Sequence, residues 1–245
     1  MKREFSILAH RGASGYAPEN TFAAFDKALE LGADMIETDV RQTRDGHLVL
    51  FHDSSMERTT NGQGLVADLT LAELKGLDAG SWFRAEFAGQ RIPTVEEFLA
   101  VYGKRILVCF EIKSPGVEER LLDLVKRYGV LDGLCFTSFH PESLGRIKEL
   151  APEARIGLLT TDFNEELIDE VVTLGAVQIC PPAAKLSRQL VALAHERRLE
   201  VRVWGAESDD LVERAIVMGA DGVTTNWPDK IAEKLRWISK GTTKK

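Results

Sequence analysis

The chain has 245 residues and a formal net charge of −7, with 44% hydrophobic and 28% charged residues. These values are ordinary for a globular chain, and the negative charge argues against a nucleic-acid partner, whose recognition needs a basic surface. The three cysteines form no CxxC pair and lie in apolar runs, so we interpret them as buried, reduced thiols. No apolar run is long enough for a signal peptide or a membrane span, so we expect a cytoplasmic protein without a membrane segment.

Eight apolar runs recur along the chain, with helical patterns between them. They are residues 5–9, 35–40, 106–112, 134–138, 155–159, 176–180, 200–204 and 221–225. Most are continuous rather than alternating, which is typical of parallel strands covered on both faces. Glycines at 32, 175 and 219 follow helical patterns, where a left-handed residue ends a helix. Eight strand–helix alternations predict an α/β fold, a (β/α)₈ TIM barrel, and no glycine-rich dinucleotide loop supports a doubly wound sheet instead.

Residues 54–93 interrupt this rhythm between the second strand and a helix whose capping box begins at Thr94. They contain turn signals, a short capped helix that starts near Thr70, and the aromatic residues Trp82 and Phe83, which we expect to be exposed. We interpret this segment as a small insertion in the loop after strand two. We therefore expect residues 1–245 to form a single domain, with the insertion at the catalytic mouth of the barrel.

Polar residues follow or end the first three predicted strands. They are His10 and Arg11 on the first, Glu37 and Asp39 on the second, and Glu111 and Lys113 on the third. Because strand side chains alternate, the two residues within each of the last two pairs share a face. Buried carboxylates are costly unless they are compensated, and a divalent cation held by oxygen ligands, Mg²⁺ or Ca²⁺, would compensate them. The alternative is a layer of internal salt bridges made with Arg11 and Lys113.

A hairpin argument places His52 beside these carboxylates. Asp45-Gly46 is a favoured two-residue hairpin loop. With that loop, Arg44 pairs with His47, and counting back along both strands sets His52 opposite Asp39.

Two histidines beside a metal suit acid–base chemistry near neutral pH. Arg11 can bind a phosphate bidentately and Lys113 can bind it as a point charge. The residues alone therefore predict the cleavage of a phosphate ester, with His10 and His52 as proton-transfer groups.

The chain resembles the glycerophosphodiester phosphodiesterase family, which has a phospholipase C-like TIM barrel. The resemblance rests on the motifs His10-Arg11-Gly12, Pro18-Glu19-Asn20-Thr21, Glu37-x-Asp39, His52-Asp53 and Glu111-Ile112-Lys113, with weaker matches at Ser138-Phe139, Trp204, Asp221-Gly222-Val223 and Pro228-Asp229. They run in the family's order from about residue 5 to 238. The set is highly specific, although each motif alone is weak.

The resemblance implies metal-dependent hydrolysis of glycerophosphodiesters to glycerol 3-phosphate and an alcohol. We expect a monomer or homodimer, a choice that the sequence leaves open. It implies metal ligation by Glu37, Asp39 and Glu111, acid–base catalysis by His10 and His52, phosphate contacts from Arg11 and Lys113, and packing of Trp204 against glycerol. The attacker is left open between water and the glycerol 2-hydroxyl.

Two departures from the family pattern touch the expected pocket rim and bear on substrate preference. They are Gly205-Ala206-Glu207 after the strand-seven tryptophan and Asn226 where an aspartate is common. Two other functions remain as alternatives. One is a lysophospholipase D or phospholipase C-like enzyme acting on lipids, aided by the aromatic residues of the insertion. The other is a non-catalytic barrel that binds phosphorylated ligands.

Overall fold

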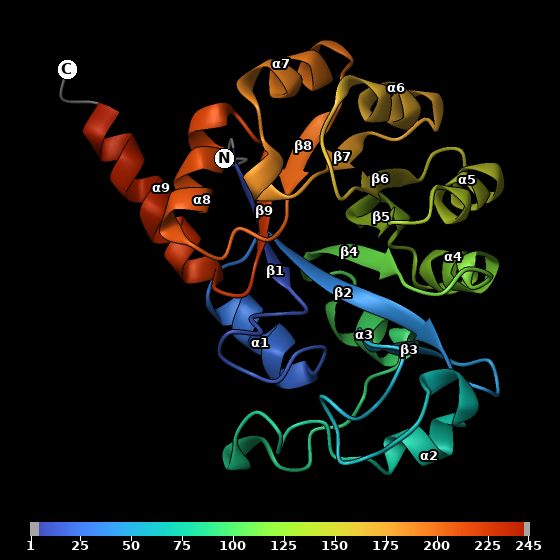
Figure 1. Ribbon diagram of the computed structural model, residues 1–245. Coiled ribbons are helices and arrows are strands. Elements are labelled where there is room, and N and C mark those ends of the chain that lie inside the picture. The colour runs from blue at the N-terminus through green and yellow to red at the C-terminus, as the bar shows by residue number, and fades with distance from the viewer. Residues whose placement is uncertain (1–4, 243–245) are drawn as a thin grey trace.

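Eight parallel strands close into a barrel in the computed structural model, which describes residues 5–242, with side chains described as far as Trp237 (Figure 1). Around the barrel the order is β1 (Ser6–His10), β2 (Met35–Gln42), β4 (Leu107–Ile112), β5 (Leu134–Ser138), β6 (Arg155–Leu159), β7 (Gln178–Cys180), β8 (Glu200–Val203) and β9 (Gly222–Thr225). The strand β9 pairs with β1, and β1 pairs with β2, so the sheet has no open edge along this circuit. The predicted TIM barrel is confirmed.

Helices surround the barrel and cover its outer face (Figure 1). They are α1 (Phe22–Glu30), α3 (Val95–Tyr102), α4 (Glu118–Tyr128), α5 (Pro141–Leu150), α6 (Glu165–Thr173), α7 (Arg188–Glu196), α8 (Asp209–Met218) and α9 (Pro228–Thr242). Their ends follow local chemistry: Thr94 makes the predicted capping box with Glu97, and Gly175 and Gly219 have φ of 72° and 89° just after helices. Among the described residues, no helix is both long and apolar enough to cross a membrane.

The insertion after strand two is a compact arm built on the short strand β3 (Leu48–Leu50). It contains α2 (Leu71–Lys75) and the 3₁₀ turns η1 (Val66–Asp68) and η2 (Ala85–Phe87); two further 3₁₀ turns, η3 (Leu131–Gly133) and η4 (Ala183–Lys185), lie elsewhere. The arm has a small hydrophobic cluster of its own, which includes Met56, Val66 and Leu74. Trp82 is 39% exposed, and its ring lies edge-to-face on Phe83 at 5.6 Å.

The hairpin register differs from the prediction by one residue. The strands β2 and β3 pair Val40 with Leu50, and the Phe51 N–H donates to the Asp39 carbonyl at 3.0 Å, so Phe51 rather than His52 lies opposite Asp39. The prediction of a two-residue loop was wrong because residues 44–46 form a three-residue loop that closes from Thr43 to His47. The φ of Gly46 is 84°, as the left-handed position of such a loop requires.

Candidate active site

Three carboxylates from two neighbouring strands meet at the carboxyl end of the barrel. Glu37 and Asp39 come from β2 and Glu111 from β4, where Asp39 and Glu111 are paired in register. One ligand oxygen from each of the three lies within 4.8 Å of the others, and all three residues are buried. Glu37 Oε1 has no hydrogen-bond donor, while Asp39 Oδ1 and Glu111 Oε1 share the ammonium group of Lys113. Three converging buried carboxylates with so few donors are the arrangement expected of a hard-cation site.

Two cations compensate this cluster in part. The Lys113 ammonium lies 2.5 Å from Glu111 Oε1 and 3.4 Å from Asp39 Oδ1, while Arg11 Nε lies 3.3 Å from Asp39 Oδ2. Burial opposes ionisation of Asp39, but Arg11 and Lys113 outweigh it and lower the pKa of that carboxyl. Burial and the neighbouring Asp39 raise the pKa of Glu111 to about 7, and burial with Asp39 and Glu111 raises the pKa of Glu37 well above its usual value. The protein's own cations therefore leave two of the three carboxylates short of positive charge.

The loop after β1 is shaped to bring its polar groups to the carboxylates. Arg11 has a φ of 55°, which is uncommon for a residue with a side chain, and its N–H donates to Glu37 Oε2 at 3.0 Å. The next residue, Gly12, has a φ of 80°, and a Cβ there would lie 2.6 Å from the Ala24 backbone. Asn20 also has a φ of 55°, and its side chain donates to Asp39 Oδ2 at 2.9 Å.

His10 ends β1 and is held by Asn226, which follows β9. The distance from His10 Nδ1 to Asn226 Oδ1 is 2.7 Å, so an amide oxygen fixes the proton on Nδ1 and leaves Nε2 for a ligand. Ser14 also donates to this Asn226 oxygen, at 2.9 Å. Burial, helped by the nearby Arg11, lowers the pKa of His10 to about 4, which favours the neutral ring.

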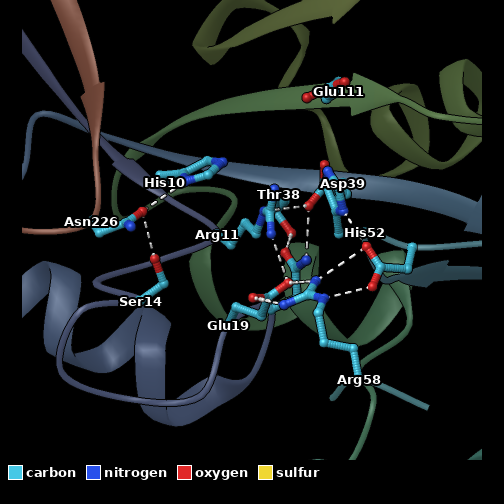
Figure 2. A network of polar contacts seen from close by, with 12 residues as sticks. His10, Arg11, Ser14, Glu19, Thr38, Asp39, His52, Arg58, Glu111 and Asn226 are labelled. Atoms are coloured by element: carbon cyan, nitrogen blue, oxygen red, sulfur yellow. Dashed lines mark hydrogen bonds and ion pairs between the residues drawn. The ribbon is translucent and has the colours of Figure 1, made fainter. Parts of the chain in front are cut away.

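His52 lies just beyond β3 and is held from two directions. Its Nδ1 lies 2.6 Å from Asp53 Oδ1, and its carbonyl accepts a hydrogen bond from Arg41 Nε at 2.8 Å. Burial lowers the pKa of His52, although the charge of Asp39 acts in the opposite direction. In Figure 2, His10 lies at the Asn226 end of the network and His52 at the end nearest Arg58. Despite the wrong register, the hairpin does deliver His52 to the mouth of the barrel.

A cavity of about 290 Å³ opens onto this cluster, a volume at the small end of the range for ligand sites. Of the eight site residues predicted from the sequence, the cavity is lined by His10, Arg11, Glu37, His52, Glu111, Lys113 and Trp204, while Asp39 lies buried behind them in the carboxylate cluster. Trp204 donates from Nε1 to the Cys180 carbonyl at 3.0 Å, and its ring lies edge-to-face with Phe139 at 5.9 Å. These two rings supply an apolar part of the cavity lining.

Comparison with known proteins places this site in a family. Residues 10–230 match the model of the Glycerophosphoryl diester phosphodiesterase family. This chain belongs to that family. The predicted family is confirmed, and with it the enzyme class, a phosphoric diester hydrolase.

Individual relatives agree with this assignment over nearly the whole chain. A glycerophosphodiester phosphodiesterase of Caldanaerobacter subterraneus subsp. tengcongensis is 41% identical, over 94% of this chain and 97% of that protein. An Oleispira antarctica phosphodiesterase solved with sn-glycerol-3-phosphate is 31% identical, with a TM-score of 0.87 over 94% of this chain and 96% of that one. A glycerophosphodiester phosphodiesterase of Agrobacterium tumefaciens, also 31% identical, has a TM-score of 0.83 over 94% of this chain and 99% of that one.

Some polar contacts of the site had no predicted role. Asn226, which the sequence suggested as a rim residue, directly contacts His10, and Glu19 and Asp53 contact Arg11 and His52. Glu19 and Asp53 lie inside motifs that carry the family resemblance, so their place next to proposed site residues could have been inferred from the sequence. Arg58, which contacts both, lies in an irregular segment of the insertion, where no periodicity indicates the direction of a side chain.

Proposed function

We propose that this chain hydrolyses glycerophosphodiesters to glycerol 3-phosphate and an alcohol, with one divalent cation, Mg²⁺ or Ca²⁺, held by Glu37, Asp39 and Glu111. The observation that carries the proposal is the convergence of three buried carboxylates, of which Glu37 has an oxygen without any donor. Family membership supports the substrate class, as does the bound sn-glycerol-3-phosphate in the Oleispira antarctica relative. When bound, the cation would supply positive charge to a phosphoryl oxygen.

His10 and His52 would move the protons of the reaction. Each ring has its Nδ1 bonded to an oxygen acceptor, Asn226 for His10 and Asp53 for His52, so each presents Nε2 to the cavity. One ring accepts a proton from the attacking hydroxyl, and the other gives a proton to the leaving alkoxide. Because one ring must be neutral and the other protonated, the account predicts a bell-shaped pH–rate curve.

The rest of the cavity would bind and orient the substrate. Arg11 and Lys113, which line the cavity and contact the carboxylates, supply positive charge for the phosphate. Trp204 and Phe139 supply an apolar surface for the carbon atoms of glycerol.

The test is a turnover assay on metal-stripped protein. Glycerophosphocholine, glycerophosphoethanolamine and glycerophosphoglycerol are supplied in turn, Mg²⁺ or Ca²⁺ is restored, and glycerol 3-phosphate is measured. We expect no product without metal and turnover with at least one cation. Lysophosphatidylcholine forms a comparison arm, and turnover of that lipid alone would contradict the proposed substrate class.

The same assay tests the histidines. We expect His10→Ala and His52→Ala each to lower kcat by about 10²-fold or more, because each removes a proton-transfer group. His195→Ala is the matched control, since that ring lies on α7 against Asp221 and outside the cavity. Near-normal turnover in either of the first two variants would remove that histidine from the chemistry.

A further inference from the structure

The insertion reaches the candidate active site through one guanidinium group. Arg58 donates to two carboxylates at once, and each contact is bidentate (Figure 2). Arg58 Nε and Nη2 lie 2.6 and 3.1 Å from the two oxygens of Asp53, and Nη1 and Nη2 lie 2.8 and 2.7 Å from the two oxygens of Glu19. A planar guanidinium can form two such forks, whereas the single ammonium of a lysine cannot.

Both carboxylates also contact proposed active-site residues. Asp53 Oδ1 lies 2.6 Å from His52 Nδ1, and Glu19 Oε1 accepts from Arg11 Nη1 at 2.8 Å. The contacts thus form a continuous series from His52 to Asp53, Arg58, Glu19 and Arg11. His52 follows β3 and Arg11 follows β1, so the series joins two segments that are distant in sequence.

The charges in this series depend on one another. Hydrogen bonds from Arg58 hold the pKa of Asp53 well below its usual range. Burial opposes ionisation of Glu19, but Arg58 and Arg11 outweigh it and lower the pKa of that carboxyl. Without Arg58, Asp53 would keep its contact with His52 and Glu19 its contact with Arg11, but each carboxylate would lose the fork that fixes its direction.

We propose that Arg58 is a positioning residue for the reaction, because its two forks fix Asp53 against His52 and Glu19 against Arg11. The side chain comes from the insertion and is 44% exposed. It contacts the two orienting carboxylates and does not line the cavity. This inference rests on the proposed function for its effect on turnover, but the geometry of the series does not depend on it. The insertion thereby contributes to orienting both the proton-transfer group and the phosphate-binding group.

The first test compares Arg58→Lys and Arg58→Ala with Arg84→Ala, a matched control on the exposed side of the same insertion. We expect kcat/KM to fall by about 10- to 100-fold in both Arg58 variants, because small misplacements of oriented groups are costly. Arg58→Lys keeps the charge and should still fold, so its loss reports the geometry of the forks. Wild-type turnover in Arg58→Lys would overturn the proposal.

The second test follows His52 directly by ¹⁵N NMR of the imidazole in metal-free protein. The groups that face this ring are Asp53, Asp39, Arg11 and Lys113. Arg58→Ala removes a positive charge that disfavours protonation of His52, so the His52 pKa should rise by about half a unit or more. Because the variant also removes the fork that orients Asp53, the ring tautomers should mix. An unchanged His52 titration and tautomer, with only a lower Tm, would assign Arg58 a structural role and overturn the proposal. A wild-type protein without turnover would instead contradict the proposed function, while the NMR result would still decide the role of Arg58.

Discussion

His10 is held by a neutral amide, Asn226, rather than by a carboxylate. The amide oxygen accepts from His10 Nδ1 at 2.7 Å but carries no full charge, so it does little to offset the burial that lowers the His10 pKa to about 4. The neutral ring is therefore the stable form throughout the physiological range, and it is lost only as the pH falls towards 4. The sequence suggested that Asn226 affects substrate preference at the rim, but it contacts His10, the proposed proton-transfer group.

The replacement Asn226→Asp tests this link. A carboxylate at Nδ1 should raise the His10 pKa by about one unit or more, so the limb of the pH–rate profile that reports His10 should move to higher pH. Kinetic measurement of kcat/KM between pH 4 and 9 follows the shift. Asn164→Asp, the same chemical change at the exposed N-cap of α6, is the control and should leave the profile unchanged. Superimposable profiles for wild type and Asn226→Asp would refute the assignment.

The alternation of side chains along strands was enough to predict from the sequence that the three carboxylates lie together. Glu37 and Asp39 share a face because strand side chains alternate, and the register of β2 with β4 sets Glu111 beside Asp39. The series through Arg58 could not be predicted in this way. It depends on loop backbone, such as the positive φ of Arg11 and Asn20, and no regular repeat encodes that geometry.

The β2–β3 hairpin is an element whose position the sequence predicted but whose register it did not. The sequence correctly indicated a turn at Asp45-Gly46, but this dipeptide fits both a two-residue and a three-residue loop. The longer loop forms here because Thr43 closes it: its hydroxyl accepts from the His47 N–H at 2.8 Å and donates to Asp45 Oδ1 at 2.7 Å. The one extra residue in the loop therefore shifts the register of β3 by one residue relative to the prediction.

Gly46 offers a direct test of that loop. Because its φ is 84°, we expect Gly46→Ala to lower the free energy of unfolding by about 1 kcal/mol. The corresponding fall in Tm is about 2–4 °C for a chain of this size. Asparagine tolerates the left-handed region better, so Gly46→Asn should cost less. Thermal unfolding followed by circular dichroism measures both variants, and equal stability of Gly46→Ala and wild type would contradict the three-residue loop.

For the whole molecule, closure of the barrel brings the functional groups together. Because β1 pairs with both β2 and β9, the ends of these strands meet, and His10, Glu37 and Asn226 become neighbours. The continuous apolar runs were sufficient to predict this architecture. We also propose that the insertion and the barrel form one domain, since Leu48 and Leu50 of β3 pack into the main core while Val49 between them packs into the insertion's cluster.

Metal binding by Glu37, Asp39 and Glu111 is the property on which the proposed function depends. Calorimetric titration of the metal-stripped protein with Mg²⁺ and Ca²⁺ measures it. We predict one bound cation per chain and an affinity weakened by about tenfold or more in each of Glu37→Gln, Asp39→Asn and Glu111→Gln. Glu142→Gln, on the surface of α5, should bind as wild type does. Failure of the wild-type protein to bind either cation, or wild-type affinity in all three site variants, would contradict the proposed metal site.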